Sequence, residues 1–152
     1  KTAPGATTGQ VAIDPSRGGA ELERQRLEAD RKLLTDPASP LSKRSVFFDY
    51  DSDRIKDEFK PLVEAHARFL RERSYQRMLI QGNADDRGSR EYNLALGQRR
   101  ADALKRALVL LGAGEKQIES TSLGEEKPRC TEATESCWAQ NRRADMLYGY
   151  EL

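Results

Sequence analysis

Residues 82–108 read GNADDRGSREYNLALGQRRADALKRAL and join a charged turn to a long amphipathic segment. The turn is bounded by glycines and holds two aspartates and an arginine. After it, apolar or small residues recur at steps of three and four, which predicts a helix over 89–111 that ends at Gly112. Its predicted buried stripe consists of Leu94, Gly97, Ala101, Leu104, Leu108 and Leu111.

Four short apolar stretches around this helix have the length and composition of β-strands. SVFF at 45–48 comes first, and RMLIQGN at 77–83 leads directly into the charged turn. IESTSLG at 118–124 and RRADMLYGY at 142–150 follow the helix. In the last of them apolar and polar side chains alternate, which is typical of a strand with one buried face.

A second helix is predicted between the first two strands, with Asp53 as its cap and its end near Ser74. Pro61 lies inside this range and predicts either a mild kink or a restart of the helix. The inward positions follow three- and four-residue steps: Ile55, Phe59, Leu62, Val63, His66, Phe69 and Leu70.

The resulting order, β-α-β-α-β-β, predicts an α+β fold. We expect a two-layer sandwich with two main helices packed on one face of a mixed four-stranded sheet. This domain covers residues 43–152, and residues 1–42 differ in composition. Their Gly-, Ala-, Thr- and Pro-rich start predicts a flexible tether, with a short helix over 21–34; simple disorder is the alternative.

The charge composition argues against a nucleic-acid partner. The chain of 152 residues has 26 basic and 25 acidic side chains, hence a formal net charge of +1. A nucleic-acid-binding domain typically has a strongly basic patch or net charge. Electrostatic recognition by this chain must therefore be local.

Catalytic and metal sites find little support in the residue types. His66 is the only histidine and lies on an apolar stripe, so a core position is expected, and a Ser–His–Asp or Cys–His arrangement is hard to assemble. DYDSD at 49–53 resembles the start of a calcium loop, but Arg54 stands where that loop needs glycine and Lys60 where it needs glutamate. We therefore expect no enzyme, no cofactor and no metal.

Two cysteines, Cys130 and Cys137, lie in CTEATESC. A structural zinc site needs four ligands, and a CxxC redox pair has two intervening residues. A short disulfide within a loop fits best and implies an oxidising compartment. The alternative is a pair of free cytosolic thiols.

The charges of the opening stretch suggest a binding site. Asp85 lies in the turn, and Asn93 and Arg100 lie on one helical face about two turns apart. If the first two strands run parallel and close together, the DYDSD loop lies at the same edge. An acid that takes an ammonium and an arginine that takes a carboxylate suit a zwitterionic ligand. The alternative is that Asp85, Arg87 and Arg100 simply pair with one another.

Four motifs in register identify a family resemblance. SVFFDYDSDRI, GNADDRG, YNLALGQRRADALK and NRRADMLY resemble the OmpA-like peptidoglycan-binding domain over about residues 43–150. The resemblance implies the same sandwich and non-covalent binding of peptidoglycan through the diaminopimelate residue of the stem peptide. By motif, the ligand-binding residues are Asp51, Ser52, Asp53, Asp85, Arg87, Asn93, Arg100 and Arg142. Asn83 stands where many relatives have histidine.

The motifs look most like those of the lipid-anchored members of this family. That resemblance implies an outer-membrane protein facing the periplasm, with a lipid anchor upstream of this sequence, that links the membrane to the cell wall. It also implies partnership with the Tol proteins, TolB in particular, and a role in envelope integrity and cell division. The competing hypothesis is a periplasmic interaction module whose charged cleft mainly docks TolB or another envelope protein.

Overall fold

The computed structural model describes residues 18–152, which fall into two compact units divided after Lys43. The first unit contains α1 (Gly19–Thr35) and the 3-10 turn η1 (Pro40–Ser42), so the helix predicted over 21–34 lies within α1. The tether predicted at the start of the chain falls, up to residue 17, outside the described residues. Within residues 18–152, no helix has both the length and the apolar character needed to cross a bilayer.

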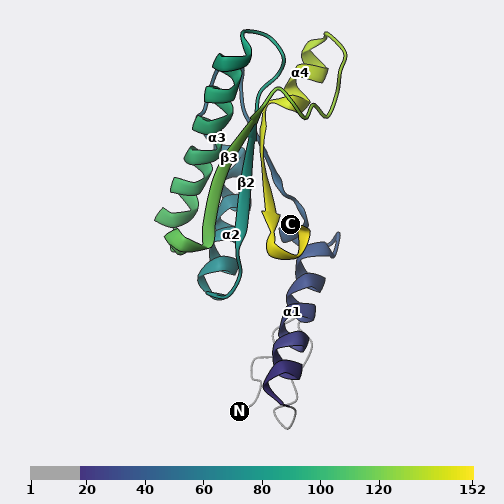
Figure 1. Cartoon of the computed structure of the whole chain (residues 1–152), viewed down its shortest axis with the longest axis vertical. Helices are drawn as coiled ribbons and strands as arrows, with labels where there is room; N and C mark the ends of the chain where they lie inside the picture. The colour runs from purple at the N-terminus through teal and green to yellow at the C-terminus, as the bar shows by residue number, and fades with distance from the viewer. Residues whose placement is uncertain (1–17) are drawn as a thin grey trace. The chain divides into compact units, whose positions relative to one another are not determined.

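The second unit, Arg44–Leu152, is built on a four-stranded mixed sheet (Figure 1). The strands are β1 (Ser45–Phe47), β2 (Met78–Asn83), β3 (Ile118–Gly124) and β4 (Arg143–Tyr148), in the spatial order β1-β4-β2-β3. β2 and β3 are parallel, whereas β4 is antiparallel to both β1 and β2. β1, β2 and β3 therefore all end at one edge of the sheet, and β4 begins there.

Two helices, α2 (Lys60–Arg71) and α3 (Arg90–Leu110), cover one face of the sheet. α3 packs on β2 and β3, and α2 packs beside it. Apolar residues from both layers fill the space between them, among them Val63, Leu70, Ile80, Leu104 and Met146. The α+β two-layer sandwich predicted from the periodicity is confirmed.

The start of α2 differs from the prediction. Asp53 does not cap it; a 3-10 turn, η2 (Asp57–Phe59), precedes a helix that begins at Lys60. Pro61 lies in the first helical turn, where its missing N–H costs no hydrogen bond, so it marks the start of the helix and not a kink. His66 is a core residue, as predicted: it is fully buried, with Nδ1 2.7 Å from the hydroxyl of Tyr148 on β4.

The buried stripe of α3 is also displaced from the predicted one. Leu94 is 51% exposed and Leu111, just beyond the helix, is 39% exposed, whereas Asn93, Leu96 and Arg100 are buried. At 100° per residue, Asn93 lies closer than Leu94 to the line through Gly97 and Leu104. Periodicity alone favoured the apolar neighbour and so missed two polar residues in the interface.

The cysteine loop contains a short helix that the sequence did not predict, α4 (Glu135–Asn141). Thr134 caps it by accepting a hydrogen bond from the backbone N–H of Cys137, and Cys130 and Cys137 form a disulfide. α4 lies beyond the edge of the sheet at which β4 begins (Figure 1). Two further 3-10 turns, η3 (Glu115–Gln117) and η4 (Gly149–Glu151), precede β3 and follow β4.

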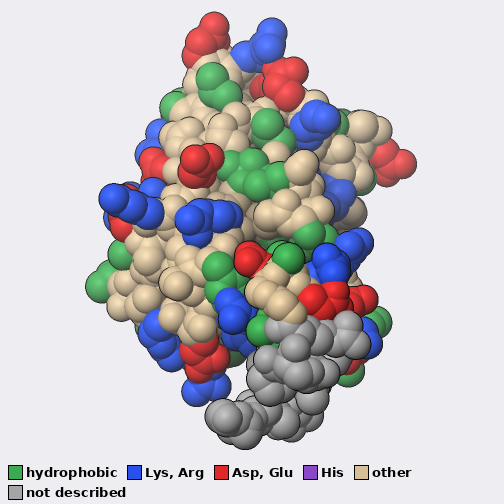
Figure 2. Space-filling model, turned by 60° about the horizontal axis from the view of Figure 1, so that its bottom comes forward, with side chains coloured by type: hydrophobic (Ala, Val, Ile, Leu, Met, Phe, Trp, Pro, Cys, Tyr) green, Lys and Arg blue, Asp and Glu red, His purple; other side chains and the backbone are tan. Residues whose placement is uncertain are grey.

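The described surface carries both signs of charge side by side. On the face drawn in Figure 2, Lys and Arg side chains are interspersed with Asp and Glu, and hydrophobic side chains lie in small groups. No single-sign field covers this face. Local geometry must therefore provide any charge recognition.

Candidate functional site

The candidate site lies at the sheet edge where β1, β2 and β3 end. Four segments meet there: the loop after β1, the turn after β2, the first three turns of α3 and the residue that precedes β4. A small cavity of about 60 Å³ opens between the first three of these segments. It is lined by Tyr50, Asp51, Asp85, Arg87, Gly88, Tyr92, Asn93, Leu96 and Arg100.

Arg100 is the largest fully buried side chain among the described residues. Its guanidinium donates to three backbone carbonyls: Nε to Ser52 at 2.8 Å, Nη1 to Asn83 at 2.8 Å and Nη2 to Asp49 at 3.1 Å. Two of these carbonyls belong to the loop after β1 and the third to the end of β2. The guanidinium therefore ties both loops to α3.

The charge of Arg100 is not paired within the domain. No carboxylate of residues 18–152 lies within ion-pairing distance of it, and the backbone bonds use three of the five N–H donors of a guanidinium. Burial lowers the pKa of Arg100 to about 10, against the opposing effect of the Asp85 charge. The group is still a cation at neutral pH, and two of its N–H donors make no hydrogen bond within residues 18–152.

Asp85 and Arg87 form an ion pair within the turn after β2. Asp85 is 5% exposed; its Oδ2 accepts from Arg87 Nη2 at 2.8 Å and its Oδ1 from Arg87 Nε at 3.2 Å. Burial alone would raise the pKa of Asp85, but the hydrogen bonds and charge of Arg87, with the charge of Arg142, lower it below the ordinary value. The carboxylate is thus ionised, and only half of the alternative interpretation holds: Arg87 is paired and Arg100 is not.

Arg142 reaches the same carboxylate from the start of β4. Its Nε donates to the carbonyl of Phe48 at 2.9 Å, its Nη2 pairs with Glu135 at 2.8 Å, and its Nη1 lies 3.6 Å from Asp85 Oδ2. This placement follows from the topology, because β4 lies between β1 and β2 and runs opposite to both. β1 and β2 are parallel, as the site prediction required, but they are not neighbours.

The loop after β1 contributes unequally. Asp51 has a left-handed backbone (φ 56°) and accepts a hydrogen bond from the hydroxyl of Tyr92. Ser52 contributes its carbonyl to Arg100, and its hydroxyl accepts from the backbone N–H of Arg54. Asp53 lies outside the cavity lining and pairs with Arg99 at 3.5 Å.

Two buried asparagines lie beside the site. Asn93 is 2% exposed and donates to Glu125 Oε1 at 2.6 Å, so its amide faces both the cavity and the end of β3. Asn83 is 1% exposed and serves Arg100 through its backbone carbonyl, while its side chain donates to the carbonyl of Gln81 at 3.0 Å. Its Oδ1 is buried without a hydrogen-bond partner among residues 18–152.

The sequence did not single out the aromatic residues of the site. Tyr50 and Tyr92 line the cavity and are 62% and 45% exposed. Trp138 on α4 lies outside the lining, but its ring centroid is 4.0 Å from the Arg87 guanidinium carbon, which also lies 4.2 Å from the centroid of the Tyr50 ring. An alternation of aromatic and charged residues in DYDSD and REYN was the available signal for the tyrosines; Trp138 had none, because α4 was not predicted.

Comparison with known proteins places this geometry in context. Residues 47–142 match the model of the OmpA family. The chain is 42% identical to the peptidoglycan-associated lipoprotein of Pseudomonas putida over 137 residues, which cover 90% of this chain and 79% of the relative. It is 43% identical to the protein of the same name from Pseudomonas aeruginosa, over 74% of this chain and 67% of the relative.

A solved structure agrees with the computed one. The crystal structure of the peptidoglycan-associated lipoprotein from Burkholderia pseudomallei superposes with a TM-score of 0.75 at 54% sequence identity. The superposition covers 76% of this chain and 98% of the other. The fold is therefore that of a known domain type.

Proposed function

The chain belongs to the OmpA family, and we propose that its folded domain binds peptidoglycan non-covalently through the diaminopimelate residue of the stem peptide. The observation that carries this proposal is the buried, carboxylate-free Arg100 beside the ionised Asp85 in one cavity. The relatives are named peptidoglycan-associated lipoproteins, which supports peptidoglycan as the ligand. The domain acts by binding and not by catalysis.

The chemistry of the end group of diaminopimelate fits this cavity. The carboxylate of this end group accepts hydrogen bonds from the two remaining N–H donors of Arg100 in a charge-assisted fork. Its ammonium approaches Asp85, which shares its oxygens with Arg87, and Asn93 offers an amide beside both. The cavity is small, and its lining is mainly charged and polar, which suits the charged end of one amino acid.

The cellular role follows from the same family. We propose that the full-length protein is lipid-anchored in the outer membrane, faces the periplasm and links that membrane to the cell wall. Residues 1–42 then serve as the tether between the anchor and the domain. Partnership with the Tol proteins, and through them a role in envelope integrity and cell division, belongs to this proposal.

Sedimentation with purified diaminopimelate-containing sacculi tests the binding. The wild-type domain should co-sediment, and Asp85→Ala and Arg100→Ala should remain in the supernatant, because truncating one partner of a desolvated charge pair costs about 2–5 kcal/mol. Tyr148→Phe is the matched control, since Tyr148 is buried against His66 on α2 and lines no part of the cavity. Retention of both site variants on the sacculi would sink the assignment.

A second candidate is a docking module for TolB or another envelope protein. The exposed rings of Tyr50 and Tyr92 around the cavity favour it, because aromatic residues are enriched in protein–protein interfaces. Titration with a soluble diaminopimelate-containing muropeptide separates the two functions. A pure docking module would give no saturable amide shifts at Asp85, Asn93 and Arg100.

A further inference from the structure

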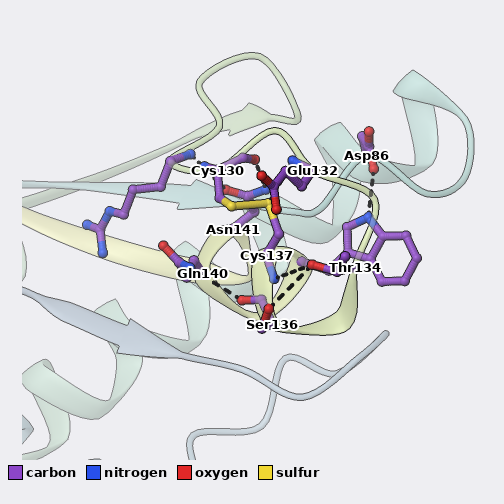
Figure 3. The surroundings of a disulfide bond; sticks show 10 residues. Asp86, Cys130, Glu132, Thr134, Ser136, Cys137, Gln140 and Asn141 are labelled. Carbon is purple, nitrogen blue, oxygen red and sulfur yellow. Dashed lines mark hydrogen bonds between the residues drawn. A yellow bond between two sulfur atoms is a disulfide. The ribbon is translucent and has the colours of Figure 1, made fainter.

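Trp138 connects the disulfide loop to the ligand site without lining the cavity. Its indole lies 4.0 Å from the guanidinium carbon of Arg87, and its Nε1 donates to Asp86 Oδ1 at 3.2 Å. The dashed line to Asp86 in Figure 3 marks this second contact. The Trp138 side chain therefore contacts the turn after β2 at two neighbouring residues.

α4, which carries Trp138, is stabilised by interactions with the loop that precedes it. It is a seven-residue helix, and isolated helices of this length are unstable in water. The disulfide closes the loop in front of it, and Asn141 at its end accepts from the backbone N–H of Cys130 at 3.1 Å and donates to the carbonyl of the same residue at 2.7 Å (Figure 3). These covalent and polar links hold the indole in place.

The Arg87 guanidinium contacts two aromatic rings. Tyr50 lies at 4.2 Å and Trp138 at 4.0 Å from its guanidinium carbon, while the guanidinium forks onto Asp85. The Arg87 side chain is 31% exposed, and a partly exposed ion pair is by itself weakly ordered. The two ring contacts limit the positions open to the guanidinium and so favour the one in which both of its donors reach the carboxylate.

We propose that Trp138 is a positioning residue of the ligand site, which the disulfide-braced α4 holds against Arg87 so that Arg87 orients the Asp85 carboxylate for the ligand. The inference has two parts. The effect of Trp138 on ligand affinity rests on the proposed peptidoglycan-binding function, whereas its effect on the position of Arg87 does not. The disulfide thereby contributes to ligand binding and not only to the stability of its own loop.

The structural half is tested by NMR on the ligand-free domain. Ring currents from the two aromatic rings that contact Arg87 should shift its Nε–H resonance away from the position of an arginine without such contacts. Trp138→Ala should move this resonance towards that position, and Trp138→Phe, which keeps a ring, should retain most of the shift. An Arg87 Nε–H resonance that is the same in wild type and Trp138→Ala overturns the proposal.

The functional half is tested by muropeptide titration of the same variants. Trp138→Ala should weaken binding about fivefold to tenfold, because a cation–π contact of this kind contributes on the order of 1 kcal/mol. Trp138→Phe should recover most of the affinity; a loss as large as that of Trp138→Ala would instead implicate the indole N–H and overturn the stacking mechanism. Asp86→Ala isolates that hydrogen bond and should bind within about twofold of wild type.

Two further variants test the role of the disulfide and provide a control distant from the site. Cys130→Ser combined with Cys137→Ser leaves Trp138 in the chain but frees α4, and it should reproduce both the resonance change and the affinity loss. Arg73→Ala removes a guanidinium 4.2 Å from the Phe69 ring, near the start of β2 and so at the opposite sheet edge, and should leave muropeptide affinity unchanged. If wild-type domain shows no saturable binding, the proposed function fails while the resonance test still decides the role of Trp138.

Discussion

Gly82 on β2 and Gly97 on α3 approach so closely that a Cβ atom on Gly82 would lie 1.7 Å from the carbonyl oxygen of Gly97. No other residue type fits at this crossing of helix and strand. Asn83 follows Gly82, and Arg100 lies one helical turn after Gly97, so the same close approach brings the Arg100 guanidinium to the Asn83 carbonyl. The core packing of two glycines thus sets the position of the Arg100 guanidinium.

Gly82→Ala should destabilise the domain by about 3 kcal/mol, because α3 must move away from β2 to admit the methyl group. Urea denaturation at neutral pH measures the free energy of unfolding. Gly149→Ala is the matched control, since an added Cβ there meets nothing within 4 Å. Equal stability of Gly82→Ala and wild type would contradict the close-approach argument.

Arg100→Lys should lose binding and about 2–3 kcal/mol of stability. An ammonium cannot reproduce the planar fork that reaches three carbonyls on two loops, so buried acceptors are left without donors. Urea denaturation and muropeptide titration measure the two effects. The neighbouring Arg99→Lys, whose partner Asp53 lies at the surface, should change neither by more than about 0.5 kcal/mol.

Asp85→Asn should destabilise the domain in a pH-dependent way. Burial raises the pKa of Asp85, but the Arg87 bonds and charges outweigh it, so the folded-state pKa lies below the unfolded value of about 3.9. The carboxylate's contribution is therefore present above that pH and is lost as the pH falls through the folded-state pKa. Urea denaturation should show a difference from wild type of about 2 kcal/mol at pH 7 that shrinks below about pH 4. A difference that stays constant down to pH 2 would rule out ionisation of Asp85 as its origin.

Reduction of the disulfide should lower stability by about 2.5 kcal/mol, the chain-entropy estimate for so short a loop. Thermal unfolding with and without a dithiol reductant measures this loss, and intact mass should rise by two hydrogens on reduction. An unchanged mass would show that Cys130 and Cys137 are free thiols. The Cys130→Ser, Cys137→Ser variant should be insensitive to the reductant in both measurements.

Much of the fold could be read from local pattern. The 3.6-residue period of 89–111 and the alternation of Ala144, Met146 and Tyr148 predicted one of the two main helices and the last strand, because one face of each element must be buried. Boundaries were less certain: Asp53 resembled a helix cap, yet the helix begins at Lys60. α4 has no periodicity long enough to detect, and the disulfide and Asn141 tie it to the loop before it.

What the sequence by itself determined was the order of the two main helices and the four strands and, through the family motifs, membership of the family; the charged residues that it assigns to a ligand stay a prediction. Only the tertiary structure decided that β4 lies between β1 and β2, which brings Arg142 to Asp85, and that Asn93 and Arg100 are buried where Leu94 is exposed. Strand order depends on contacts between residues far apart in the chain, and no local period encodes them. The same holds for the stack of Tyr50, Arg87 and Trp138, whose members come from three segments that meet only in the folded domain.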